Sequence, residues 1–223
     1  YLGCGYPLFA SAVYAVCGLG KELPLFLVQI VLQMVSVAFV FHVGRRVAGP
    51  VAAAVGSAFF VFHPVLIWLS LTVMTEALLV PLTAGLTWLL VARHGAIHRL
   101  GRSGRAVIIG ACLALMALTR ATCAGFVVIA AALLAWESRH ERPRRRCLIQ
   151  PLFMFGAFVV LCAPWTIRNY VHWGRFIPFS TKSGVNAWFF NHPGLRVEFS
   201  PAAFEGPQPI DIFDPRIQNL PDE

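Results

Sequence analysis

Long uncharged runs of apolar residues are the feature that most constrains the fold of this 223-residue chain. Short polar segments separate six such runs, at residues 23–44, 47–75, 77–92, 106–119, 121–136 and 147–167. The longest reach the roughly 20 residues that an α-helix needs to cross the hydrocarbon of a bilayer, and the shorter ones need partners or tilt. The sequence therefore predicts an all-α membrane protein, a polytopic helical bundle of about six spans.

Composition agrees with a membrane location, because 58% of the residues are hydrophobic and only 13% are charged, whereas a soluble domain carries about a quarter charged residues. Residues 6–19 are too short to span and predict an interfacial helix at the start of the chain. Within the last run we expect a span from about Leu148 that ends at Pro164, and from Gly174 the chain becomes rich in proline and charge. We predict a transmembrane helical region at 1–173 and an irregular extracytoplasmic loop or tail at 174–223.

The net charge of +8 is distributed as expected for a multi-pass protein of the cell membrane. Eleven arginines fall in the segments after the first, third and fifth runs, whereas the short segments between the other runs hold only Arg120. The positive-inside rule places the arginine-rich loops in the cytoplasm and the C-terminal tail outside. Nucleic acid is an unsupported partner, because the basic residues lack the aromatic interleaving of a single-strand platform.

Two ionisable residues within the apolar region are candidates for a site. Glu76 is the only carboxylate between Glu22 and Glu137, and an ionisable group near membrane depth is a functional candidate. A carboxylate also stabilises a helix N-terminus, so a capping role stays open for Glu76. Arg120, predicted to lie on the same side of the membrane, suits an anionic headgroup or a phosphate, although snorkelling to the interface explains it equally well.

A third group of candidates follows the last apolar run. Arg168, Lys182 and the amides of Asn169 and Asn186 could face a phosphate and sugar hydroxyls, with Trp188 stacking on a sugar. An aromatic membrane anchor with unrelated cations is the alternative interpretation. Metal ligation has no support from the spacing of the six cysteines and seven histidines, so no metal site is predicted and any divalent metal cofactor is unknown.

Several stretches together resemble the GT-C class of integral-membrane glycosyltransferases, which includes protein O-mannosyltransferases and the lipid A aminoarabinose transferase. They are "GYPLFASAVYAVCG", "FHVGRRVAGPVAAAVGSAFFVFHPVLIWLSLTVMTEALLV", "LALMALTRATCAGFVVIAAALLAW" and "PWTIRNYVHWGRFIPFSTKSGVNAWFFNHPG". The resemblance implies transfer of a sugar from a polyprenyl-phosphate carrier to an acceptor at the outer face of the membrane. It also implies a catalytic carboxylate and cations that bind the phosphate.

The chain departs from the family pattern at its start. Family members usually carry an Asp in a first external loop, upstream of the stretch that matches "GYP", so we expect the main catalytic base outside this sequence and this chain to be inactive alone. Glu76, in the matching "TE" stretch, is then a secondary catalytic candidate, and Arg120, Arg168, Asn169, Lys182 and Asn186 are substrate-binding candidates. The sugar and the acceptor are not indicated. A transporter or flippase, or a non-catalytic membrane scaffold, are the alternative functions.

Overall fold

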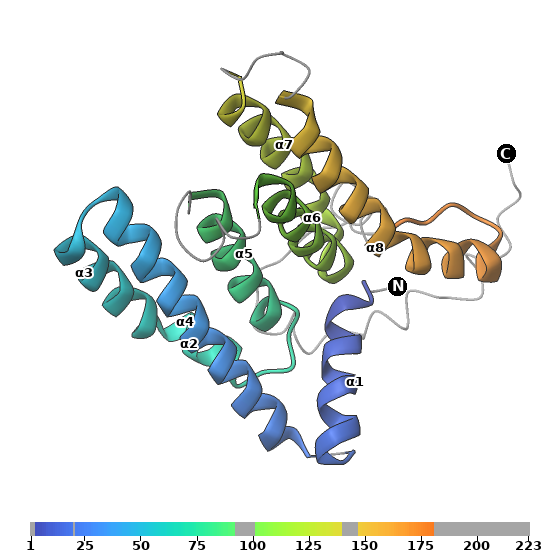
Figure 1. The fold of residues 1–223 in the computed structure, drawn as a ribbon. Coiled ribbons are helices and arrows are strands. Elements are labelled where there is room, and N and C mark those ends of the chain that lie inside the picture. Colours follow the sequence, from blue (N-terminus) through green and yellow to red (C-terminus); the bar gives the residue numbers. More distant parts are fainter. Residues whose placement is uncertain (1–2, 20, 92–100, 140–146, 181–223) are drawn as a thin grey trace, which may run out of the picture. The chain divides into compact units, whose positions relative to one another are not determined.

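The computed structural model describes residues 3–19, 21–91, 101–139 and 147–180, and in this part of the chain every regular element is a helix (Figure 1). The elements in chain order are α1 (Gly5–Cys17), α2 (Glu22–Val47), α3 (Pro50–Val61), α4 (Pro64–Ser70), α5 (Glu76–Val91), α6 (Gly101–Thr119), the 3-10 helix η2 (Ala121–Gly125), α7 (Phe126–Glu137) and α8 (Ile149–Trp173). The predicted all-α class is confirmed.

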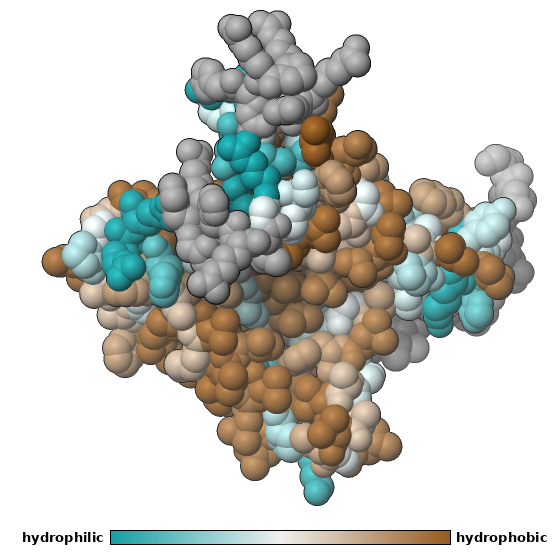
Figure 2. All heavy atoms as spheres, in the orientation of Figure 1, coloured by the Kyte–Doolittle hydropathy of each residue, from teal (hydrophilic) through white to brown (hydrophobic). Residues whose placement is uncertain are grey.

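The helices expose apolar side chains over much of their surface. Figure 2 shows hydrophobic residues covering most of the visible face, and large side chains such as Phe59, Leu152 and Val160 are well exposed. Soluble monomers rarely expose apolar patches of this extent, whereas a bilayer requires them. The structure is therefore that of an all-α membrane protein.

Helix length identifies fewer clear spans than the apolar runs do. Among the described residues α2, α6 and α8 are long and apolar enough to cross a bilayer, and α3 with α4, which meet at a bend of 56°, would make a fourth. The other helices, including α5 and α7, are shorter and apolar. The count of about six spans stays a prediction that depends on these shorter helices.

Contacts between the helices fix their relative directions. α2 and α3 form an antiparallel hairpin, and Phe39 of α2 packs against Trp88 of α5 with ring centroids 5.1 Å apart. Cys112 of α6 donates to the Leu82 carbonyl of α5 at 3.4 Å, and α6 lies alongside α8 (Figure 1). The main apolar core lies among α5, α6, α7 and α8.

Because of these helix directions, arginines from all three arginine-rich segments, where the structure describes them, lie at one end of the helices. Arg45 and Arg46 lie in the last turn of α2. This helix runs parallel to α5, because Leu25 and Ala77 near their starts lie in one buried cluster and Phe39 packs on Trp88 further along both. Arg105 bonds to the Leu89 carbonyl near the end of α5 and to Glu137 at the end of α7. The first turn of α5 and the ends of α6 and α8 lie at the opposite end, so the charge pattern coincides with a structural polarity. The side of the membrane on which each end lies stays a prediction.

Local sequence explains most of the helix ends. Pro50 and Pro64 occupy the first positions of α3 and α4, where the missing N–H of proline costs nothing. The turn before α3 is made by Gly49 at a φ of 88°, a left-handed conformation that favours glycine. The predicted break at Arg120 is confirmed, because α6 ends at Thr119 and α7 returns until its last residue, Glu137, meets Arg105 near the start of α6.

One predicted helix end is wrong. α8 does not stop at Pro164 but continues to Trp173, where Gly174 ends it in the left-handed conformation at a φ of 62°. Proline is tolerated inside membrane helices because other groups satisfy the neighbouring backbone. The helix continues beyond the proline, and there the hydroxyl of Thr166 also donates to the Cys162 carbonyl at 3.0 Å. The segment before Trp173 is thus helix rather than loop.

Contacts along the chain group residues Tyr1–Ser183 into one compact unit, which contains every described residue. The predicted division between residues 173 and 174 stays a prediction, since most of the second part lies outside the described residues.

Candidate functional site

Glu76 and Arg120, which were predicted to lie on one side of the membrane, form an ion pair. Glu76 is the first residue of α5, and Arg120 directly follows α6. Arg120 Nη1 donates to Glu76 Oε1, and the hydroxyl of Thr75 donates to Glu76 Oε2 at 2.9 Å. Both side chains are accessible, with 35% of Glu76 and 54% of Arg120 exposed. The fold thus joins a carboxylate and a guanidinium that are 44 residues apart in the sequence.

The start of α1 fixes the end of α6 that carries Arg120. Gly3 and Gly5 lie so close to Leu118 and Thr119 that a Cβ atom on either glycine would overlap these residues. Glycine is needed here for close approach rather than for an unusual φ angle. Arg120 is held in turn by its own backbone N–H, which donates to the Met116 carbonyl at 2.8 Å.

A buried amide fixes the segment that leads to Glu76. Gln29 of α2 accepts a hydrogen bond from the Tyr6 hydroxyl at 3.0 Å and donates to the carbonyls of Ser70 and Thr72, each at 3.2 Å. Burial raises the pKa of Tyr6 to about 12, so its hydroxyl stays protonated and remains a donor at neutral pH. These bonds hold α1, α2 and the start of the Glu76 segment together.

Gln29 was not among the residues singled out from the sequence. A sequence pattern points to it, however. Gln29, Gln33 and Ser36 lie four and three residues apart in an otherwise apolar run, so they share one polar helix face. All three side chains are buried.

A groove begins at Glu76, the carboxylate of the ion pair, and continues along α5; we name it the Glu76 groove. It has a volume of about 600 Å³, and Glu76 is the only charged residue among those that line it: Val40, Val43, Gly44, Phe60, Leu66, Leu69, Glu76, Leu79, Val80, Thr83, Ala84 and Thr87. From Glu76 to Thr87 the helix advances about 16 Å at 1.5 Å per residue. The site therefore combines a charged end with a long apolar wall.

Arg168 lies at the same end of the helices as Arg120 but stacks on its own helix. Its guanidinium carbon is 4.8 Å from the ring centroid of Trp165. Burial raises the pKa of the Cys4 thiol, and the positive charge of Arg168 acts in the opposite direction. Cys4 precedes the first turn of α1, whose start packs against the end of α6, so Arg168 is near that junction.

Asn169 has a partner within the protein. Its side chain is buried, and Nδ2 donates to the Ile177 carbonyl at 2.9 Å. Trp165 Nε1 also donates to this segment, to the Phe179 carbonyl at 3.1 Å. The amide of Asn169 therefore helps to fold residues 174–180 back onto the last turns of α8, and its role in substrate binding stays a prediction.

The structure does not describe the remaining candidate residues, and it shows no metal site in the part of the chain that it describes. Lys182 and Asn186 lie outside the described residues, as does Trp188. Within residues 3–19, 21–91, 101–139 and 147–180, no group of three or more His, Cys, Asp or Glu is placed to hold a metal ion.

Comparison with known proteins identifies the family. Residues 4–167 match the family model described as dolichyl-phosphate-mannose-protein mannosyltransferase, which covers well over half of the chain and includes Glu76 and Arg120. No individual curated protein and no solved structure matches significantly. The family match confirms the resemblance to GT-C class glycosyltransferases, and the chain therefore belongs to the dolichyl-phosphate-mannose-protein mannosyltransferase family.

Proposed function

We propose that this chain forms part of an enzyme that transfers a sugar, with mannose favoured by the family, from a polyprenyl-phosphate carrier to an acceptor at the outer face of the membrane. The observation that carries this proposal is the Glu76–Arg120 ion pair at the end of the Glu76 groove. Of the residues proposed for the site, these two are in direct contact. The sequence marks Glu76 as an ionisable residue in an apolar region and Arg120 as a cation suited to a phosphate.

The groove is chemically complementary to an amphiphilic sugar donor. A polyprenyl chain is apolar and uncharged, so it can lie along the mainly apolar wall formed by α2, α3, α4 and α5. Its phosphate is anionic and would remain at the polar end, where Arg120 offers a guanidinium. One ligand thus accounts for both ends of the groove.

Arg120 can exchange its ion pair with Glu76 for a bond to phosphate at a small cost in free energy. Salt bridges between exposed side chains contribute only about 0–1 kcal/mol, and Arg120 is more than half exposed. A phosphate offers several acceptor oxygens and can take Arg120 from Glu76. Glu76 would then be free to accept a proton, so donor binding would also prepare a base.

The reaction then follows simple acid–base chemistry. The acceptor hydroxyl attacks the anomeric carbon of the sugar, and the bond from that carbon to the phosphate oxygen breaks. The hydroxyl proton passes to Glu76, and the carrier phosphate leaves with the bonding electrons, stabilised by Arg120. We assign supporting contacts to the phosphate and sugar to Arg168, Lys182 and Asn186.

The test measures sugar transfer by the full-length protein in liposomes with radiolabelled polyprenyl-phosphate mannose. We expect Arg120→Ala to lower kcat/KM for the donor by about tenfold or more, as for the loss of one charge-assisted hydrogen bond, with partial recovery in Arg120→Lys. Glu76→Gln should lower kcat by about a hundredfold or more while the KM for the donor changes little, because the carboxamide is a poor base.

Arg139→Ala is the matched control, because this arginine lies just beyond α7 at the opposite end of the helices and stacks over Trp136 at 3.7 Å. It should leave transfer unchanged. Unaltered donor kinetics in Arg120→Ala would refute the phosphate-binding role. Movement of the labelled lipid across the bilayer without sugar transfer would instead favour the transporter, and neither activity would favour the scaffold.

A further inference from the structure

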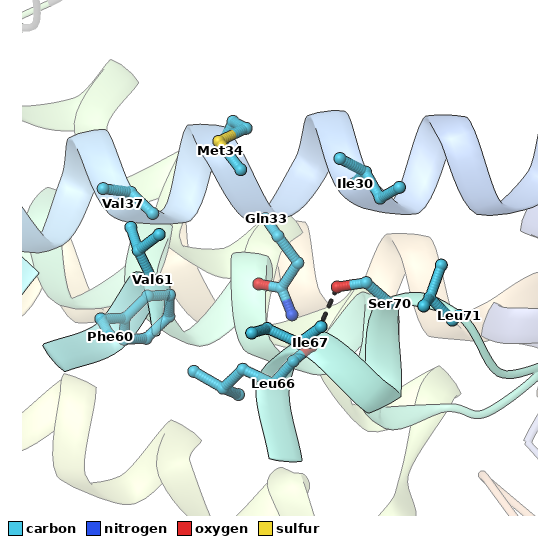
Figure 3. A pocket seen from close by; sticks show the side chains of 10 residues that line it. All are labelled: Ile30, Gln33, Met34, Val37, Phe60, Val61, Leu66, Ile67, Ser70 and Leu71. Carbon is cyan, nitrogen blue, oxygen red and sulfur yellow. Dashed lines mark hydrogen bonds between the residues drawn. The ribbon is translucent and has the colours of Figure 1, made fainter. Parts of the chain in front are cut away.

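A second groove lies between α2, α3 and α4, and we name it the Gln33 groove (Figure 3). Its volume is about 230 Å³, and its lining is almost entirely apolar: Ile30, Gln33, Met34, Val37, Phe60, Val61, Leu66, Ile67, Ser70 and Leu71. Phe60 and Leu66 also line the Glu76 groove. The two grooves therefore share part of a wall, but Glu76 does not line the Gln33 groove.

The amide of Gln33 is buried without a partner. Its side chain is 6% exposed, and neither Oε1 nor Nε2 makes a hydrogen bond. Gln29, one turn earlier on the same face, shows the usual arrangement, since its amide oxygen accepts one bond and its nitrogen donates two. Buried polar groups are nearly always hydrogen-bonded, so an unpaired amide indicates a partner from outside the protein.

The amide is directed into the groove. In Figure 3 the Gln33 side chain extends from α2 into the space above α4, among the apolar side chains that line it. The nearby hydroxyl of Ser70 already donates its proton to the Leu66 carbonyl at 2.9 Å. Gln33 therefore receives no hydrogen bond from Ser70, and both its acceptor oxygen Oε1 and its donor nitrogen Nε2 are available to a ligand.

The position of the groove restricts the ligand to the membrane phase. Met34, Ile67 and Leu71 are about half exposed on an apolar surface, so a molecule can enter from the side. Gln33 lies near the middle of α2, the most apolar candidate span. A charged headgroup is costly at that depth, whereas an uncharged one can descend to it.

We propose that the Gln33 groove binds an uncharged glycerolipid with a free hydroxyl, of the diacylglycerol type. The hydroxyl donates to Gln33 Oε1, the neighbouring ester carbonyl accepts from Nε2, and the acyl chains leave between Met34 and Ile67. This site is separate from the donor site proposed above and does not depend on sugar transfer.

The first experiment is photolabelling of the full-length protein in nanodiscs. The probes are a diacylglycerol with a diazirine in one acyl chain and its 3-O-methyl ether, which lacks the donor. We expect the free-hydroxyl probe to label peptides of α2 and α4, and the methyl ether or Gln33→Leu to reduce labelling about tenfold, as for lost hydrogen bonds. Excess unlabelled phosphatidylglycerol should compete weakly, because it is charged.

Two further variants and a stability measurement guard against a general structural effect. Ile67→Trp should fill the groove and abolish labelling, whereas Val55→Trp, on an exposed face of α3 outside the groove, should not. Without lipid, Gln33→Leu should raise the Tm in detergent, because it removes an unpaired buried amide. Dioleoylglycerol should raise the Tm of the wild type but not of Gln33→Leu.

Several results would overturn the proposal. They are equal labelling by the two probes, unchanged labelling of Gln33→Leu, full competition by phosphatidylglycerol, and a groove that holds only water, with no labelling and no response of the Tm to dioleoylglycerol. Arg120→Ala should be labelled like the wild type, so a failure of the proposed enzyme and a failure of this lipid site are distinguished.

Discussion

Arg105 joins three helices through one buried side chain. Its Nε donates to the Leu89 carbonyl at 2.9 Å and its Nη2 to the Leu90 carbonyl at 3.0 Å, which satisfies two carbonyls at the end of α5. The same guanidinium donates to both carboxylate oxygens of Glu137 in α7, at 3.0 and 3.1 Å. Arg105 is 6% exposed, so these bonds are the reason that a charge is tolerated there.

Replacement of Arg105 should be strongly destabilising. Arg105→Met leaves the carboxylate of Glu137 and two carbonyls without this partner. Removal of one member of a fully buried ion pair costs about 3–5 kcal/mol, and because 24% of the Glu137 side chain is exposed we expect the lower end of this range. Unfolding of the purified protein in detergent, followed by circular dichroism, measures the effect. Arg45→Met, which removes an exposed arginine at the same end of the helices, should change stability little. Equal stability of the two variants would contradict this assignment.

Some residues of the site were predictable from the sequence and others were not, for a physical reason. Glu76 and Arg120 were found because an isolated charge in apolar sequence stands out, and the alternation of spans predicted that both lie on one side. Arg105 was counted only as one of many arginines in a basic loop, and Asn169 was expected to face a substrate. Which partner a long polar side chain reaches depends on packing between helices, and a single sequence does not contain that information.

At the scale of elements, α6 and α8 pack with a close backbone contact at Gly110. A Cβ atom at Gly110 would overlap the Met154 carbonyl of α8, so glycine is required for the approach of the two helices. At Gly156 of α8, by contrast, a Cβ atom would meet open space. The two glycines therefore offer a matched pair of sites on the same helix pair.

Gly110→Ala should destabilise the protein by about 1–3 kcal/mol, as for overpacking in a well-packed core. Gly156→Ala should be neutral or stabilise α8 by up to about 1 kcal/mol, because alanine is the better helix former. Thermal unfolding in detergent compares the two. If Gly110→Ala were as stable as Gly156→Ala, the close approach of α6 to α8 would be wrong.

Element boundaries were predictable where the chain changes chemistry. The division at Arg120 appears as expected, because a charge interrupts the apolar sequence there. The end of α8 was misplaced at Pro164, since a proline that would end a soluble helix is accommodated in a membrane helix. Apolar run length also gave about six spans, whereas the structure contains several helices too short to cross a bilayer without tilt or partners.

At the scale of the whole molecule, the polarity of the helices predicts an orientation. Described arginines at 45, 46, 105 and 139 lie at the end opposite the Glu76–Arg120 pair, and the positive-inside rule places that end in the cytoplasm. A reporter inserted at Gly49 should therefore be protected from external protease or modification, and one inserted after Gly174 should be accessible. Accessibility in the reverse sense would place the proposed site on the wrong side for an external acceptor.

α6 differs from the other long helices in how it meets its surroundings. In its most apolar stretch of 18 residues, 50% is buried inside the protein, compared with 22% in α2 and in α8. The mean hydropathy of that stretch, 1.4, is the lowest of the three helices. Its main partner, α8, is synthesised after it. We therefore expect α6 to enter the bilayer with a weaker affinity for lipid than α2 or α8 and to become stable there only after α8 has been made, so that the two helices insert cooperatively.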